Sequence, residues 1–224
     1  MKNKVIIISP HPDDETLGAG GTLHKHKNNG DEIYWLIITD IESSPYFTNE
    51  QKNNRKEEIE LISKIYSFDK VFNLNYIPSS LTQNNLSNLI EKISKIFLEI
   101  KPNILYLPNR SDVHSDHRII FDATFSCTKS FRYPFIKMIL MYECLSETEF
   151  SPALPENSFI ANYFIDISEF IDKKISAMKI YKSEIDNHPF PRSIENIISL
   201  AKYRGASCGV KYAEAFHLLK FIDK

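Results

Sequence analysis

The sequence predicts an α/β fold: a Rossmann-like three-layer sandwich whose central sheet is mainly parallel. Short, continuously apolar runs alternate along the chain with helix-like stretches, a pattern typical of parallel strands that helices cover on both faces. No linker, internal repeat or low-complexity run interrupts the 224 residues, so we expect a single domain over residues 1–224. Clusters of His and Asp directly follow the first and fourth strands. They predict a metal site at the carboxyl ends of those two strands.

Each predicted element has a local signal. β-branched residues predominate in the strand-like runs, and stretches such as 86–100 carry apolar residues three or four apart, as amphipathic helices do. Asn28-Asn29-Gly30 and Lys101-Pro102 are typical of helix ends. We expect strands over 5–8, 33–39, 71–74, 104–107, 138–142 and 163–167. We expect helices over 15–28, 50–66, 86–100, 115–130, 168–185 and 193–203, and the type of 209–216 stays open.

Composition narrows the class of protein. Hydrophobic residues make up 42% and charged residues 25% of the chain, which excludes a disordered protein. A domain of this size buries enough surface to fold without a disulfide or a structural metal. A metal bound here would therefore serve chemistry rather than stability. The net charge of −2 predicts neither a nucleic-acid nor an anionic-membrane partner. Three cysteines without a CxxC motif, no signal-peptide pattern and no transmembrane stretch favour a cytoplasmic protein.

Two polar motifs follow strands of the predicted sheet. The first strand runs into Pro10-His11-Pro12-Asp13-Asp14-Glu15, and the fourth into a segment that ends in His114-Ser115-Asp116-His117. In doubly wound sheets these strands are commonly neighbours, because the strand order reverses there, and ligands bind outside the carboxyl ends of the strands at that point. We therefore expect the two motifs to face each other across one crevice.

The residue types of the two motifs suit a catalytic metal. Two imidazoles and one carboxylate, with a fourth position open, are a common zinc arrangement that can lower the pKa of a water molecule to about 7. A second carboxylate beside the ion can take and return a proton, and the adjacent Asp13 and Asp14 suit that division. The same ligands could hold Fe²⁺ or another divalent metal. The candidates are His11, His114, His117, Asp13, Asp14, Asp112, Asp116 and Glu15.

Each motif taken alone has an alternative interpretation. Asp13 or Asp14 before a helix is a common N-cap, and His114 and His117 could be ordinary surface residues. Both motifs together, each after a strand, favour the metal site.

The motifs resemble those of the zinc-dependent N-deacetylases of the LmbE-like or PIG-L family, and the resemblance covers nearly the whole chain. Besides the two motifs, Arg55-Lys-Glu-Glu58 resembles the Arg-x-x-Glu of the helix after the second strand. Tyr203-Arg-Gly205 and the segment 209–216 resemble the C-terminal signature of the family. Ser115 stands where many members have Pro.

The resemblance implies a role for most of these residues. His11, Asp14 and His117 would bind zinc. Asp13 would be the general base that activates water and then passes the proton to the departing amine.

It implies two further roles and a substrate. His114, as an imidazolium, would stabilise the oxyanion, which places positive charge where negative charge develops. Asp116 would orient His114 and favour its charged form. The implied partner is a small-molecule amino sugar of the N-acetylglucosamine type, free or attached to a lipid, polyol, nucleotide or peptide. Members of the family also tend to assemble, so a homo-oligomer is possible.

Two arginines are candidates for substrate binding. Arg110 lies beside the second motif and could pair with a carboxylate or phosphate of the substrate, or with Asp112. Arg55 could contact the substrate or form a structural ion pair with Glu58. For Arg204, Gly205 and Glu214, an architectural role is favoured.

Other features carry less functional information. Gly18, Gly20 and Gly21 lie inside the first helix, and not directly after the strand as in a dinucleotide fingerprint. They therefore predict close helix packing behind the metal. His24 and His26 are expected to face solvent. The loops 40–49, 75–85 and 143–158 should rim the crevice, and their aromatic residues could stack on a sugar or anchor the loops: Tyr46, Phe47, Tyr76 and Phe150.

The sequence thus favours a metal-dependent hydrolase that removes acetyl from an N-acetylglucosamine-type sugar or conjugate, releasing acetate and a free amine. A hydrolase of another bond, such as a phosphoester, is the first alternative, and it would often use two metals about 4 Å apart. A sugar- or nucleotide-binding module without catalysis is the second.

Overall fold

A seven-stranded sheet forms the middle layer, in the order β3-β2-β1-β4-β5-β7-β6. The computed structural model describes residues 2–223. Five neighbouring strands, β3 to β5 in that order, are parallel, and β7 pairs antiparallel with both β5 and β6. The strands are β1 Lys4–Ser9, β2 Glu32–Thr39, β3 Lys70–Tyr76, β4 Ile104–Pro108, β5 Met138–Tyr142, β6 Tyr163–Asp166 and β7 Ala213–Phe221.

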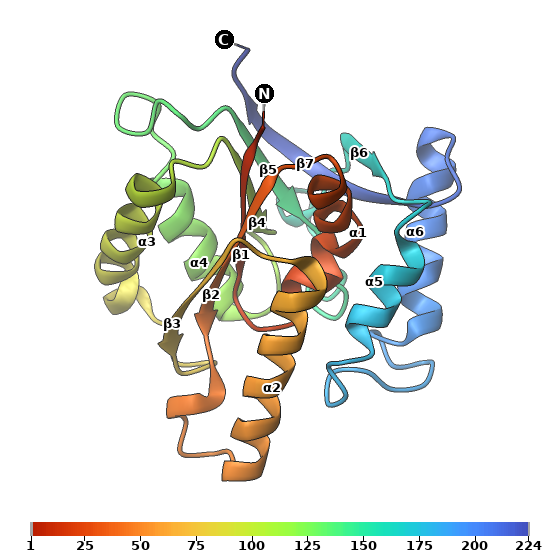
Figure 1. Cartoon of the computed structure of the whole chain (residues 1–224), viewed down its shortest axis with the longest axis horizontal. Coiled ribbons are helices and arrows are strands. Elements are labelled where there is room, and N and C mark those ends of the chain that lie inside the picture. Colours follow the sequence, from red (N-terminus) through yellow and green to blue (C-terminus); the bar gives the residue numbers. More distant parts are fainter. Residues whose placement is uncertain (1, 224) are drawn as a thin grey trace.

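Helices cover both faces of the sheet, which confirms the predicted three-layer sandwich (Figure 1). The α-helices are α1 Asp14–Asn28, α2 Asn49–Tyr66, α3 Leu86–Ile100, α4 Ser115–Ser126, α5 Ile171–Met178 and α6 Ile194–Cys208. Short 3₁₀ helices are η1 Ile41–Ser43, η2 Gln83–Asn85 and η3 Pro155–Asn157. Alternate residues of β1 point to opposite layers: Val5 and Ile7 join the core under α1, α5 and α6, and Ile6 and Ile8 the core under α3 and α4.

The C-terminal part departs from the prediction. Instead of a helix over 168–185, α5 ends at Met178, because the buried Tyr181 turns under α1 and donates its hydroxyl hydrogen to Glu15 Oε1 at 2.8 Å. The helix expected over 115–130 ends at Ser126. The open segment 209–216 leads into β7.

Close packing of α1 explains its three glycines, as predicted. A Cβ added to Gly18 would lie 2.3 Å from the Tyr142 ring, and one added to Gly21 would lie 2.7 Å from Ile167. The helix is kinked at Ala19, where φ is −146°. These contacts bring the start of α1 tightly against the sheet, behind the two polar motifs.

Glu214 of β7 holds the kinked part of α1. Its buried carboxylate accepts hydrogen bonds from the backbone N–H groups of Gly21 (3.0 Å) and Thr22 (2.7 Å) and pairs with Lys174 of α5 at 2.6 Å. Arg204 of α6 makes a two-point ion pair with Glu143, which follows β5. The C-terminal signature therefore has the architectural role that the sequence favoured.

The expectation for His24 and His26 is wrong. His24 is buried, with its ring 4.6 Å from the Tyr66 ring. His26 is largely buried between Asp31 (2.7 Å) and the Tyr106 hydroxyl (2.8 Å). No helix within residues 2–223 is long and apolar enough to cross a membrane.

Gly18→Ala tests the packing of α1. Alanine favours a helix over glycine by about 1 kcal/mol, but the added methyl overlaps the Tyr142 ring. We expect the free energy of unfolding, measured in urea, to fall by about 1–3 kcal/mol. A variant as stable as the parent, or more so, would show that α1 can move away from β5 at little cost.

Candidate metal centre and active site

The two polar motifs meet at the carboxyl ends of β1 and β4. These strands are adjacent and parallel, with Val5 paired to Ile104 and Ile7 to Tyr106, as the predicted strand order requires. The segment after β1 therefore lies beside the segment after β4. The ring centroids of His11 and His117 are 5.3 Å apart.

His11, Asp14 and His117 form a compact set of metal-binding groups. Asp14 Oδ2 lies 3.4 Å from His11 Nδ1 and 3.4 Å from His117 Nε2, and one ligand atom from each residue lies within 4.8 Å of the others. His117 Nε2 is buried and has no hydrogen-bond partner among residues 2–223. A buried nitrogen without a hydrogen-bond partner, next to a carboxylate and a second imidazole, fits a divalent cation.

Carboxylates hold the other ring nitrogens of both histidines. Asp112 Oδ2 lies 2.8 Å from His117 Nδ1, and Asp116 Oδ2 lies 3.2 Å from His11 Nε2. Asp112 is itself fixed by Asn109 (2.8 Å) and by the Thr148 hydroxyl (2.7 Å). Such outer carboxylates fix the tautomer and orientation of histidines that bind metals.

A second group, His11, His114 and Asp116, also brings three ligand atoms together. Two of the atoms that would bind a metal in this group already accept hydrogen bonds. Asp116 Oδ2 accepts the Ser79 N–H at 2.7 Å, and His114 Nδ1 accepts the Asp116 N–H at 3.1 Å. The set with His117 therefore fits a metal better.

The electrostatics of the three residues match that assignment. Burial alone would lower the pKa of His11, but hydrogen bonds with Asp116 and Asp14 raise it to about 9. Burial alone would raise the pKa of Asp14, but His117 and His11 hold it well below its usual range. A cation binding here would replace protons, so metal binding should release them.

Asp13 lies beside this set, in an unusual backbone conformation. Its φ is 147°, a region that is costly for a residue with a side chain and is often found at functional sites. Asp13 precedes α1, but its side chain makes no capping hydrogen bond, so the N-cap interpretation does not explain it. Burial first, and then repulsion by Asp14, raise the pKa of Asp13 well above its usual value.

His114 differs from the expectation in its charge and in its partner. Burial, and then the neighbouring His11, lower the pKa of His114 to about 4, so this structure favours a neutral ring and not an imidazolium. Its Nδ1 accepts a backbone N–H, which leaves Nε2 to carry the proton. The Asp116 carboxylate is closer to His11 (3.2 Å) than to His114 Nδ1 (3.9 Å).

A cavity of about 720 Å³ opens beside the site, and His11, Asp13, Asp14 and His114 line it. All three predicted rim loops contribute to its lining, through Phe47, Pro78 and Glu147 among others, and so do α2 and the segment after α5. Of the four loop aromatics, Phe47 lines the cavity, whereas Tyr46, Tyr76 and Phe150 do not.

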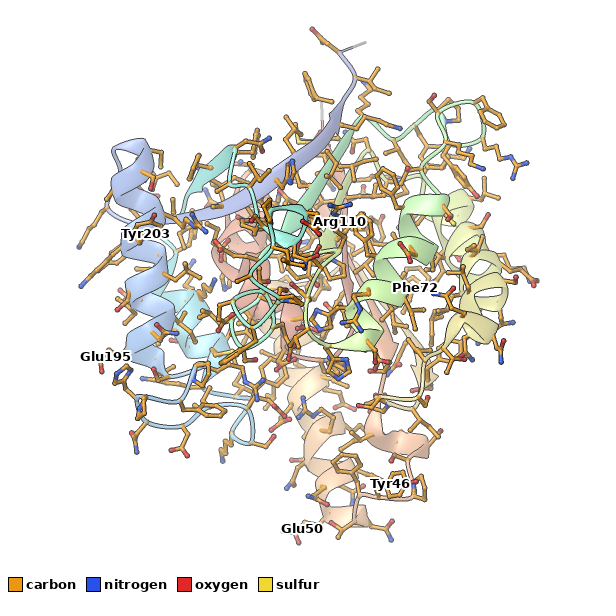
Figure 2. The ribbon with its side chains drawn as sticks, turned by 180° about the vertical axis from the view of Figure 1, so that it is seen from behind. Tyr46, Glu50, Phe72, Arg110, Glu195 and Tyr203 are labelled. Atoms are coloured by element: carbon orange, nitrogen blue, oxygen red, sulfur yellow. The ribbon has the colours of Figure 1, made fainter. Side chains whose placement is uncertain are left out.

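The structure separates the two candidate arginines. Arg55 lines the cavity, donates to the Pro12 carbonyl at 2.6 Å and pairs with Glu58 and Glu184. Arg110 is exposed, donates to the Glu156 carbonyl at 2.7 Å and does not line the cavity (Figure 2). The expected contact of Arg110 with substrate is therefore not supported, because its side chain turns toward the loop that contains η3.

The sequence predicts that the loop 143–158 rims the crevice, but not that its first turn contacts the site residues. The thiol of Cys144 donates to Asp14 Oδ1 at 3.1 Å. Glu147 Oε2 accepts the His114 N–H at 3.2 Å, and the Thr148 hydroxyl donates to Asp112. One turn thus contacts both motifs. No spacing or residue type signals it, since the contacts depend on how β5 lies beside β4.

Comparison with known proteins agrees with this site. The family model described as PIG-L, GlcNAc-PI de-N-acetylase, matches residues 6–128. A diacetylchitobiose deacetylase of Thermococcus kodakarensis is 23% identical, over 96% of this chain and 83% of that protein. A probable N-acetyl-α-D-glucosaminyl L-malate deacetylase 2 of Bacillus cereus is also 23% identical, over 83% of this chain and 86% of that protein.

A solved structure shares the fold. The N,N'-diacetylchitobiose deacetylase from Pyrococcus horikoshii, in complex with its inhibitor MPG, superposes with a TM-score of 0.73 at 21% identity. The match covers 97% of this chain and 84% of that chain. Since the family model spans more than half of the sequence, including both polar motifs, the chain belongs to the PIG-L family.

Proposed function

We propose that this protein is a metal-dependent N-deacetylase that hydrolyses the acetamide of an N-acetylglucosamine-type sugar, releasing acetate and a free amine. One observation carries the proposal: His117 Nε2, which has no hydrogen-bond partner among residues 2–223, lies with Asp14 and His11 beside a buried carboxylate, Asp13, and His11, Asp13 and Asp14 line a cavity. Family membership supports the same reaction. The relatives do not fix the attached group, because they are named for a disaccharide and for a malate conjugate at equal identity.

His11, Asp14 and His117 would hold the ion, which we propose to be zinc. Two imidazoles and one carboxylate are a frequent catalytic zinc set, although Fe²⁺ accepts the same ligands. Zinc in this position supplies Lewis-acid chemistry at the amide carbonyl and at the attacking water.

Asp13 is the proposed general base. Its carboxylate lines the cavity and makes no hydrogen bond or ion pair with any residue between 2 and 223, so it is free to accept a proton from water. A raised pKa suits that task, because proton transfer is most effective when the pKa of the base is near the working pH. The same carboxyl group then returns the proton to the departing nitrogen.

His114 is the proposed oxyanion donor. With Nδ1 engaged by the backbone, the neutral ring can donate from Nε2 to the oxygen that gains negative charge. Asp116 would then act chiefly on His11, the residue it contacts most closely.

The two alternatives gain no support. A two-metal phosphoester site would need His11 to serve both candidate ligand groups, because they share it. A binding module without catalysis would have no need of an unpaired, buried Asp13. Release of acetate, but not phosphate, by the metal-loaded protein separates the three possibilities.

Asp13→Asn tests the base. The amide keeps the size of the side chain but cannot accept a proton, so we expect kcat for acetate release to fall by about 10²- to 10⁴-fold. Bound metal, measured by elemental analysis, should stay near that of the parent. Normal turnover in this variant would show that another group activates the water.

His117→Ala tests the metal ligands. We expect it to lose bound zinc and, with it, activity, because it removes the unpaired nitrogen. His24→Ala is the control, since His24 is also a buried histidine but lies outside the site. Equal metal content in the two variants would contradict the assignment.

Cys144→Ala tests the turn after β5. Without the thiol, Asp14 Oδ1 loses its partner, so we expect zinc affinity, measured by competition with a chromophoric chelator, to fall about ten- to a hundredfold. Cys127→Ala is the matched control: Cys127 is equally buried, but its thiol lies near the Ile90 carbonyl on the other face of the sheet. Cys144→Ser, which keeps a donor, should retain more affinity than Cys144→Ala. Equal affinity in all three variants would show that the thiol does not position Asp14.

A further inference from the structure

We propose that the unit attached to the N-acetylglucosamine is uncharged and has the size and polarity of a second sugar ring. The inference rests on the proposed deacetylase function and adds the class of substrate to it. It depends on the charges, the apolar side chains and the extent of the cavity.

Acidic side chains outnumber basic ones around the cavity. Seven acidic residues and four basic residues line it, which leaves one formal negative charge in excess when one divalent cation is bound and Asp13 is ionised. Three of these acids lie outside the two polar motifs, just after β2, on α2 and in the turn after β5: Asp40, Glu57 and Glu147. A carboxylate or phosphate on the substrate would enter against this charge, whereas a neutral unit would not.

The cavity's two arginines are already paired. Arg55 contacts Glu58 at 3.2 Å and also pairs with Glu184. Arg192 donates to the Glu184 carbonyl at 2.8 Å, to Ser146 Oγ at 2.8 Å and to Glu184 Oε2 at 3.2 Å. An anionic group would have to break these pairs, and leaving the half-buried Glu58 or Glu184 carboxylate unpaired would cost free energy.

The remaining cations lie in solvent. Lys179 and Lys182 line the cavity, but both are exposed residues after α5. Exposed charges contribute little to binding, because water and salt screen them. The exposed Glu57 is screened in the same way as these lysines, so the buried Asp40 and the half-buried Glu147 carry more of the repulsion.

The walls are suited to a sugar ring. Phe47 (37% exposed) and Leu61 (48% exposed) present apolar surface, and Asn54 of α2 has no side-chain partner in the described part of the chain. Sugars offer apolar C–H faces and hydroxyl groups, which match an aromatic ring and a free amide. Lining residues run from Gln51 to Leu61 of α2, about 15 Å of helix, so the cavity has room for more than one ring.

The first test compares three substrates of the metal-loaded protein: N-acetylglucosamine, diacetylchitobiose and the malate conjugate of N-acetylglucosamine. We expect kcat/KM for the disaccharide to exceed that for the malate conjugate at least about tenfold at low salt. Raising the salt from about 50 to about 500 mM should narrow this gap, because salt screens the repulsion of the conjugate.

Two pairs of variants localise the effect. Glu57→Lys should raise kcat/KM for the malate conjugate relative to the disaccharide about threefold or more, whereas Glu60→Lys, on the same helix but outside the cavity, should not.

Phe47→Ala should reduce the ratio of disaccharide to monosaccharide kcat/KM. Its control is Tyr46→Ala: Tyr46 precedes α2 near Glu50 (Figure 2), is 87% exposed and does not line the cavity.

The outcomes separate this inference from the proposed function. If acetate is released but the malate conjugate reacts as fast as the disaccharide or faster, the protein is a deacetylase and the neutral-substrate inference is wrong. If the metal-loaded protein deacetylates none of the three sugars, the proposed function itself fails. Equal effects of Glu57→Lys and Glu60→Lys would also overturn the inference.

Discussion

The Asp14 carboxylate is the point on which the site depends. One of its oxygens lies 3.4 Å from an imidazole of each polar motif and accepts the His11 N–H at 2.8 Å. Asp14 can do this because β1 and β4 are adjacent and parallel, so that two segments about a hundred residues apart end at the same edge of the sheet. Its other oxygen is held by Cys144, which follows the next strand, β5. Three neighbouring strands thus converge on one side chain.

This convergence concentrates negative charge that a stable core would not contain. Five carboxyl groups from the two motifs are at most 6% exposed: Asp13, Asp14, Glu15, Asp112 and Asp116. Buried carboxylates cost free energy unless donors or cations compensate them. The Glu15 carboxylate accepts hydrogen bonds from the Thr16 and Tyr181 hydroxyls and from the Asp13 N–H. Burial nevertheless raises its pKa to about 7. Such an arrangement fits the proposed cation better than it fits a role in the stability of the fold.

The sequence predicts the parts of the structure that local pattern and strand order determine. Buried runs such as 5–8 and 33–39 identify the strands, and the strand order then brings His11 and His117 together without further information. Local pattern and strand order do not predict the contacts that side chains make with residues distant in the sequence. Tyr181 ends α5 early because it reaches Glu15, Arg110 turns to the Glu156 carbonyl, and Asp116 faces His11 more closely than His114. Each of these depends on distances that no sequence spacing contains.

The arrangement around Arg55 determines whether Asp13 can work as a base. Arg55 is close enough to lower the pKa of Asp13, against burial and the charges of Asp14 and Glu184, which raise it. Its guanidinium instead donates to the Pro12 carbonyl and pairs with Glu58 and Glu184. Burial and the negative charge of Asp14 then prevail and raise the pKa of Asp13. In the proposed mechanism, the Arg-x-x-Glu pair of α2 would therefore act on the chemistry indirectly, because the acids that hold Arg55 leave the Asp13 carboxyl group unpaired.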